Sequence, residues 1–248
     1  MKKIIVLSIV FFAALSAFTA KAQVAHGNYW GIFGGVSVPT GEFGKAFYGD
    51  FLDNTIDNKA GFAKTGYTIG LDGVWYVHKT NWAIAATISY QDQGQLNAND
   101  AHTLAAGYQD AFGVDTGAAS TSNRYQNLNI LVGPQYSFFF SKFAVDLRAN
   151  VGIVKSFSTP EMDIKITDAD IPYQFSQLSS TAMGFAYGGS ADLRYQLGKK
   201  ISLVLKENYV ASPGIDITNT NRVNSAGRLD TKQPISETQT TLCLAFGF

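Results

Sequence analysis

Apolar and polar residues alternate along eight stretches of this chain. The clearest stretch covers residues 143–154, where apolar side chains occupy the odd positions and charged, polar or small ones occupy most even positions. A period of two places neighbouring side chains on opposite faces of an extended chain and therefore predicts a β-strand. On this basis we predict eight strands, at residues 29–38, 65–77, 82–91, 125–138, 143–154, 182–197, 201–209 and 238–248.

One face of these strands is apolar, and the other carries charges, hydroxyl groups and glycines. Residues 182–197 and 238–248 repeat the division that residues 143–154 display. This division suits a barrel with lipid outside and a polar lumen inside. Eleven residues of about 3.3 Å each, tilted by about 40°, rise roughly 28 Å, close to the apolar band of about 25 Å in outer-membrane barrels.

The connections between the predicted strands alternate in length. Short turns occupy residues 78–81, 139–142 and 198–200, and long polar segments occupy residues 39–64, 92–124, 155–181 and 210–237. In bacterial outer-membrane barrels the short turns face the periplasm, the long loops face outward, and the strand number is even. We therefore predict one all-β domain at residues 23–248, an eight-stranded antiparallel up-and-down transmembrane β-barrel.

The N-terminal region has the pattern of a cleavable signal peptide. Lys2 and Lys3 precede an apolar run at residues 4–18, and Ala20 and Ala22 stand where a signal peptidase reads small residues. We expect cleavage after Ala22, export, and an outer-membrane location. A single membrane anchor is the alternative, but the run is shorter than the roughly 20 residues that a spanning helix needs.

Aromatic residues fall into two groups along the predicted strands. One group lies near the short turns (Trp30, Trp75, Trp82, Phe138, Phe143, Tyr195 and Phe248), and the other lies near the long loops (Tyr67, Tyr90, Tyr125, Phe185 and Tyr209). Amphipathic rings prefer the depth of the lipid headgroups, so two girdles are expected. Core aromatics of a soluble β-protein are the alternative, and the asymmetry of the loops favours the membrane barrel.

Composition and charge exclude several classes of protein. Without the three lysines of the predicted signal, 16 basic side chains stand against 19 acidic ones, a net charge of −3 that does not attract nucleic acid. Cys243 is the single cysteine of the sequence, which excludes a disulfide framework and a thiolate metal cluster.

Six charged residues are expected to point into the lumen: Asp72, Asp146, Arg148, Asp192, Arg194 and Lys206. The turn centred on Lys199 places Asp192 opposite Lys206. A second register would place Asp146 opposite Arg194 and Arg148 opposite Asp192. We predict an ion-pair network of the five residues from 146 to 206, with Gln135 and Ser137 beside it, because unpaired charges in a narrow lumen are costly. A water-filled channel lined by these charges is the alternative.

Catalytic and metal-binding signals are weak. The three histidines are His26, His78 and His102, and the last stands in an Asp-x-His pair with Asp100. Outer-membrane proteases use such a pair together with a second acidic pair, and no second acidic pair stands at a matching strand end here.

Four acidic residues (Glu161, Asp163, Asp168 and Asp170) lack the consensus of a calcium loop. Gly31, Gly34 and Gly35 lie in a strand, which argues against a nucleotide-binding loop. We expect no enzyme, metal or cofactor site.

Two segments carry a family resemblance. They are the opening Trp30-Gly31-Ile32-Phe33-Gly34-Gly35-Val36-Ser37-Val38-Pro39 with Gly41, and the closing Leu242-Cys243-Leu244-Ala245-Phe246-Gly247-Phe248. With the signal peptide, they make residues 23–248 resemble the small outer-membrane β-barrel proteins of the OmpX/OmpA type. The resemblance implies that the barrel-insertion machinery reads a signal formed by Leu242, Leu244, Phe246 and Phe248. The expected partners of the chain are therefore this machinery, during insertion, and outer-membrane lipid.

Two classes of function remain open at this point. A scaffold would meet an unknown extracellular ligand through its four long loops, with a plugged lumen, since such folds place function in loops. A small porin would pass ions or small solutes. Eight strands enclose just enough space for their own side chains, which favours the scaffold. We expect a monomer by default.

Overall fold

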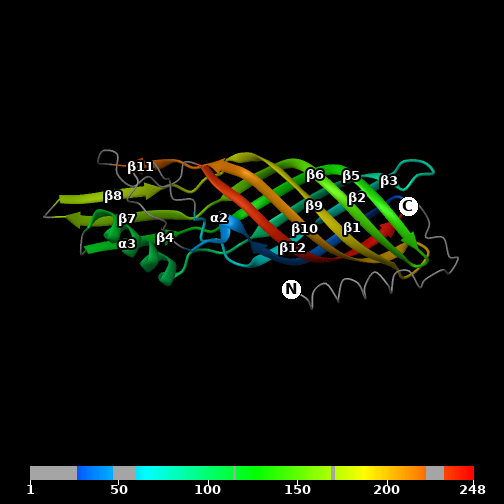
Figure 1. Cartoon of the computed structure of the whole chain (residues 1–248), viewed down its shortest axis with the longest axis horizontal. Coiled ribbons are helices and arrows are strands. Elements are labelled where there is room, and N and C mark those ends of the chain that lie inside the picture. Colours follow the sequence, from blue (N-terminus) through cyan, green and yellow to red (C-terminus); the bar gives the residue numbers. More distant parts are fainter. Residues whose placement is uncertain (1–26, 47–59, 114–115, 169–170, 222–231) are drawn as a thin grey trace, which may run out of the picture.

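The barrel predicted from the alternation is present. The computed structural model describes residues 27–46, 60–113, 116–168, 171–221 and 232–248; the predicted signal peptide and His26 lie outside this range. Eight antiparallel strands close into one barrel (Figure 1) in the order β1-β12-β10-β9-β6-β5-β3-β2. They are β1 (Tyr29–Pro39), β2 (Gly66–Tyr76), β3 (Trp82–Asp92), β5 (Gln126–Phe140), β6 (Phe143–Ser158), β9 (Met183–Gln196), β10 (Ile201–Asp216) and β12 (Lys232–Gly247). Each of the eight predicted strands is thereby confirmed.

Three of these strands run further outward than the alternation indicated. Strand β6 continues to Ser158, β10 continues to Asp216, and β12 begins at Lys232. Along the outer end of β10, Val210, Ala211 and Ser212 are all buried, and the pairing with β12 shifts between Ser212 and Ile215, so a period of two no longer marks the strand there.

The outward face of the barrel is apolar, as predicted. On β6, Leu147 and Val151 are exposed, whereas Asp146 and Arg148 are buried in the lumen. Rings meet in pairs near the short turns, as in Trp30 with Phe246 and Phe143 with Tyr195. A closed barrel with an exposed apolar exterior and a polar interior is the architecture of an integral outer-membrane protein.

The prediction of the outer girdle is wrong for one residue, Tyr125. Tyr125 is fully buried, and its ring packs edge-on against Phe43 at 4.8 Å. It precedes β5, where odd-numbered residues such as Leu131 face inward and even-numbered ones such as Val132 face outward. Its position in this alternation places Tyr125 inside.

The segments predicted as long loops contain regular structure, which corrects that part of the prediction. Four strands form a second sheet in the order β11-β8-β7-β4. They are β4 (Thr116–Ser122), β7 (Glu161–Asp168), β8 (Ile171–Gln177) and β11 (Asn219–Asn221), and helix α3 (Ala98–Phe112) packs against β4 and β7. We call this sheet and helix the outer unit. It lies beyond the end of the barrel opposite the C-terminus (Figure 1).

The outer unit has a hydrophobic core of its own. Phe62, Leu96, Leu104, Tyr108 and Ile164 are buried together there. Helix α3 begins with a capping box, in which the Asn97 side chain accepts from the Asp100 amide and the Asp100 carboxylate accepts from the Asn97 amide. No helix in the described part of the chain is long and apolar enough to cross a membrane.

Candidate functional site

The lumen brings the six predicted charged residues close together, all of them buried. Arg148 makes a bidentate ion pair with Asp72, in which two guanidinium nitrogens each lie 2.7 Å from a different carboxylate oxygen. The Arg148 guanidinium also lies 3.2 Å from the Asp192 carboxylate. Lys206 lies 3.2 Å from Asp72 on the facing wall. Arg194 binds Asp146 at 3.0 Å. Acids and bases therefore alternate across the narrow interior, which limits the cost of burying them.

One predicted register is confirmed and the other is wrong. Asp192 faces Lys206 across β9 and β10, as the tight turn requires. Between β6 and β9, however, Asp146 faces Asp192 and Ala144 faces Arg194, a shift of two residues from the prediction. The expected partners still meet, because an arginine side chain reaches a diagonal neighbour as readily as a directly opposite one.

Asp72 holds a more central position than predicted. The five-residue network was expected on β6, β9 and β10, but Asp72 on β2 accepts from both Arg148 and Lys206. Thr87 donates a further hydrogen bond of 2.5 Å to Asp72. The register of strands joined by tight turns could not reveal this contact, because it crosses the lumen rather than following the wall.

Neutral groups surround the charges. Arg148 donates to Gln135 at 2.7 Å, and Gln135 and Ser137 occupy the positions predicted for them beside Arg148 and Asp146. Arg194 donates to the Tyr76 hydroxyl group at 2.8 Å, and its guanidinium lies over the Tyr29 ring. Tyr29 and Tyr76 were missed by the sequence reasoning, which searched the inward positions for charges alone.

A second polar layer surrounds Glu237, which the sequence analysis placed in a loop. Its buried carboxylate accepts from Ser37 at 2.8 Å, Gln239 at 2.7 Å and Asn129 at 3.2 Å, and also from Gln93. Four donors from β1, β5, β12 and the segment after β3 therefore hold one carboxylate inside the barrel.

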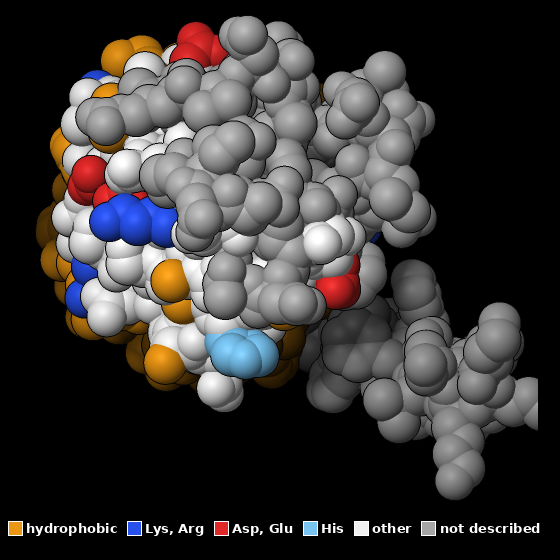
Figure 2. Space-filling model, turned by 90° about the vertical axis from the view of Figure 1, so that its left-hand side faces the viewer, with side chains coloured by type: hydrophobic (Ala, Val, Ile, Leu, Met, Phe, Trp, Pro, Cys, Tyr) orange, Lys and Arg blue, Asp and Glu red, His pale blue; other side chains and the backbone are white. Residues whose placement is uncertain are grey.

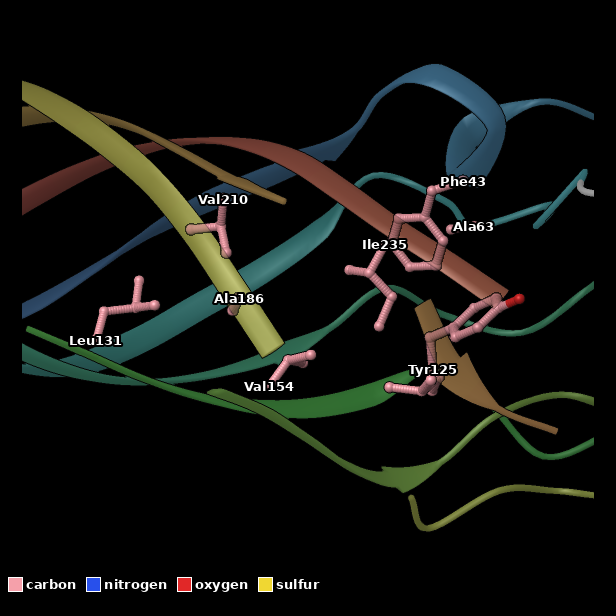
Figure 3. Close-up of a cluster of buried hydrophobic side chains, with 9 residues drawn as sticks. Phe43, Ala63, Tyr125, Leu131, Val154, Ala186, Val210 and Ile235 are labelled. Carbon is pink, nitrogen blue, oxygen red and sulfur yellow. The ribbon is translucent and has the colours of Figure 1, made fainter. Parts of the chain in front are cut away.

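Apolar side chains close the outer end of the lumen. Phe43, on the short helix α2 (Gly41–Gly44), turns inward to meet Tyr125 and Ile235 (Figure 3). Leu131, Val154 and Val210 belong to the same cluster. The Tyr125 hydroxyl group donates to the carbonyl of Gly61 at 2.8 Å, which fixes the ring across the opening. We call this cluster the lumen cap.

A groove of about 740 Å³ lies between α3 and β4 in the outer unit. It is lined by small or uncharged residues and His102, including Ala98, Ala101, Ala118 and Ser120. Figure 2 views this end of the molecule: hydrophobic side chains crowd the barrel wall behind it, and charges are scattered over the part that faces the viewer. Burial in the core of the outer unit raises the pKa of Tyr108 well above its usual value, so this side chain stays neutral.

Candidate catalytic and metal-binding residues do not converge. The Asp100 carboxylate is engaged by Lys64 at 2.7 Å and by the Asn97 amide, while His102 lines the groove. Glu161 accepts from Asn123, and Asp163 accepts from Ser176. The side chain of Asp168 and all of Asp170 lie outside the described residues. Within the described ranges, no three His, Cys, Asp or Glu side chains gather as metal ligands would.

The residues of the predicted assembly signal lie on the outward face of β12 and at the chain end beside it. Leu242, Leu244 and Phe248 are exposed, and Phe246 packs against Trp30 of β1 with 4.9 Å between the ring centroids. Their side chains are therefore presented to lipid in the finished barrel. Recognition by the insertion machinery stays a prediction.

Comparison with known proteins finds similar structures but no similar sequence. No protein-family model and no curated protein matches the chain. Neisserial surface protein A is 9% identical, with a TM-score of 0.48 over 89% of this chain and 97% of that one. A major outer membrane protein from Thermus thermophilus is 15% identical, with a TM-score of 0.46 over 90% and 100%. Outer membrane protein H from P. aeruginosa is 16% identical, with a TM-score of 0.39 over 90% and 99%.

Proposed function

We propose that this outer-membrane barrel is a surface scaffold whose outer unit binds an extracellular partner. The observation that carries the proposal is the outer unit itself, a sheet and helix with their own buried core, supported on a barrel whose interior is filled. Long loops of a transport barrel need no such core. A packed unit instead offers fixed side chains to a partner, which lowers the entropic cost of binding.

The filled lumen supports a scaffold over a pore. The ion-paired layer, the Glu237 layer and the lumen cap follow one another along the interior, and each is made of side chains from several strands. An eight-stranded barrel has little space beyond what such side chains occupy. A solute crossing the barrel would have to displace both paired charges and packed rings.

Single-channel recording tests this part of the proposal. Refolded protein in a planar bilayer should show no stable conducting steps, and Phe43→Ala should behave in the same way because the two polar layers remain. Stable steps on the order of hundreds of picosiemens in the unaltered protein, as for an open water-filled lumen, would contradict the scaffold and favour a porin.

One observation favours the small porin as a second candidate. Several buried oxygens in the lumen accept no hydrogen bond from any described residue, among them those of Asp192, Ser190, Asn208 and Thr241. Buried polar groups of this kind are usually satisfied by water. A hydrated strip along β9, β10 and β12 would be the route of any conduction, and Asp192→Ala would then alter the conductance.

The groove between α3 and β4 is the binding site that we infer for the scaffold. Among the described strands, β4 pairs with β7 alone, so its other edge presents unpaired backbone groups beside the groove. Natural sheet edges are usually protected by charge, proline or shortness. Strand β11 at the opposite edge has three residues, whereas β4 has seven and contains neither a charge nor a proline. An extended, uncharged peptide segment fits this edge by adding a strand.

Labelled heptapeptides test the groove. A neutral Ser/Thr/Val peptide should bind the full-length protein in detergent at least tenfold more tightly than acidic or basic peptides of equal length, measured by fluorescence anisotropy. Ala118→Lys or Ser120→Lys, at exposed positions of β4, should abolish this preference, whereas Thr103→Lys on α3, away from the groove, should preserve it. Equal binding by all three variants would place the peptide elsewhere and contradict the site.

A further inference from the structure

Glu237 differs from the other buried acids because it has no positive partner. Five other carboxylates are buried among the described residues, and each forms an ion pair with an arginine or a lysine: Asp72, Asp92, Asp100, Asp146 and Asp192. No arginine or lysine of the described residues forms an ion pair with Glu237. Inside the barrel, three buried basic side chains (Arg148, Arg194 and Lys206) stand against four buried acidic ones, a net charge of −1. A buried charge without a counter-ion is costly, so we expect one positive charge beside Glu237.

The hydrogen bonds of Glu237 argue against a proton as that charge. Its Oε2 atom accepts from Ser37 and Gln93, and its Oε1 atom accepts from Gln239 and Asn129. Three of these four donors are amide N–H₂ groups, which can only donate. A protonated carboxyl group would need an acceptor in place of one of them. The arrangement is therefore that of an ionised carboxylate, because hydrogen bonds donated to the charged form favour it.

Buried oxygens without hydrogen-bond donors adjoin this carboxylate. We call five side chains whose oxygens accept no hydrogen bond from any described residue the oxygen set: Thr68, Gln91, Gln93, Asn127 and Asn129. The amide groups of Gln93 and Asn129 donate to Glu237 through nitrogen, so their oxygens lie within a few ångströms of its charge. Thr68 faces Gln91 across β2 and β3, and Gln91 faces Asn127 across β3 and β5. Since Gln93 and Asn129 each follow a member of this row by two positions, the set forms one block on the inner wall.

We propose that the oxygen set binds a monovalent metal cation of the Na⁺ or K⁺ class, with Glu237 as its counter-ion. Neutral oxygens suit such an ion, as carbonyl oxygens do in potassium-selective filters. One monovalent cation brings the net charge of the lumen to zero, whereas a divalent ion is usually held by several carboxylates and would reverse the imbalance. Water would satisfy the oxygens but would not balance the charge. The amides of Gln93 and Asn129 connect the two charges, because each donates to the carboxylate and offers its oxygen to the cation.

Unfolding in different salts tests the site. The full-length protein is refolded in a zwitterionic detergent and unfolded by urea in the chloride of sodium, potassium or N-methylglucamine at equal concentration, and heat-modifiable gel migration measures the folded fraction. Sodium or potassium at ten times its dissociation constant should lower the unfolding equilibrium constant about tenfold relative to the large organic cation. Thr68→Val removes one oxygen of the set and should weaken this dependence. Ser190→Ala removes a buried hydroxyl group that also lacks a donor but lies outside the set, and it should preserve the dependence.

Sodium NMR measures binding independently of stability. The folded protein should broaden the Na⁺ resonance, added K⁺ should reverse the broadening, and Glu237→Gln, which removes the charge and keeps the size, should abolish it. If Glu237→Gln does not fold, Thr68→Val and Ser190→Ala decide the question by the same measurement. Equal stability in all three salts without broadening would overturn the proposal and assign the oxygens to water. Broadening that persists in folded Glu237→Gln would place the cation elsewhere, and stabilisation by Ca²⁺ or Mg²⁺ alone would exclude a monovalent ion; either result overturns the proposal.

Discussion

The charged layer of the barrel interior and the core of the outer unit bury opposite chemistry. In the barrel, Asp72, Arg148 and Lys206 are buried while Leu147 and Val151 are exposed. In the outer unit, Leu104 and Ile164 are buried, as in any soluble domain. The solvent explains the difference, because the barrel wall meets lipid and the outer unit meets water.

This contrast separates two sources of stability within one chain. The outer unit gains from removing apolar surface from water, at roughly 25 cal/mol per Å². The barrel interior combines apolar clusters, the lumen cap among them, with charged and polar layers, so its stability also depends on strand pairing and on the matching of buried charges. Substitutions should therefore act differently in the two regions, and the following three variants are ordered from the largest expected effect to the smallest.

Replacing Arg148 with methionine should be the most damaging. It leaves Asp72 and Asp192 without their shared guanidinium, and removing one partner of a buried ion pair costs about 3–5 kcal/mol. Urea unfolding in detergent, followed by gel migration, measures the loss. Arg148→Lys retains the charge and should lose less. Equal losses in both variants would show that packing, not charge, is decisive there.

Replacing Leu104 with alanine should unfold the outer unit and spare the barrel. Leu104 is fully buried on α3, and removing a buried leucine side chain costs about 2–5 kcal/mol. Amide exchange should accelerate across α3 and β4 while the barrel strands stay protected and heat-modifiable migration is unchanged. Simultaneous loss of barrel protection would show that the two regions form one cooperative unit.

Replacing Asn97 with alanine should have the smallest effect. The substitution removes the side-chain acceptor of the capping box, which is worth about 1 kcal/mol. Exchange should quicken in the first turn of α3 alone. Asn97→Asp preserves an acceptor and serves as the control. Loss of helical signal throughout α3 would indicate that the cap nucleates the helix.

The barrel could be predicted because the same alternation of side chains that marks each strand also sets which face meets lipid and which meets the lumen. A period of two identifies the strands, and tight turns fix the pairing of strands they join, as for Asp192 with Lys206. The pairing of β6 with β9 was mispredicted because β7 and β8 lie between them in the chain, so no turn constrains the register. Charge pairing is a weak guide to register, since long side chains tolerate a shift of two residues.

The outer unit was missed for a different reason. Strand β4 consists of Gly, Ala, Ser and Thr, which carry little strand signal, and its pairing with β7 joins distant segments. Helix α3 did carry a recognisable signal, in the capping residues Asn97 and Asp100 and the apolar spacing of Leu104 and Tyr108.

The position of Glu237 bears on how the barrel closes. Its donors come from both edges of the seam between β1 and β12 and from two further parts of the chain, and Ser37 is separated from it by 200 positions. An unclosed sheet leaves this carboxylate in water, and a sheet joined in the wrong register buries it away from its donors. Incorrect closure of the seam therefore carries the desolvation cost of a buried carboxylate without its donors.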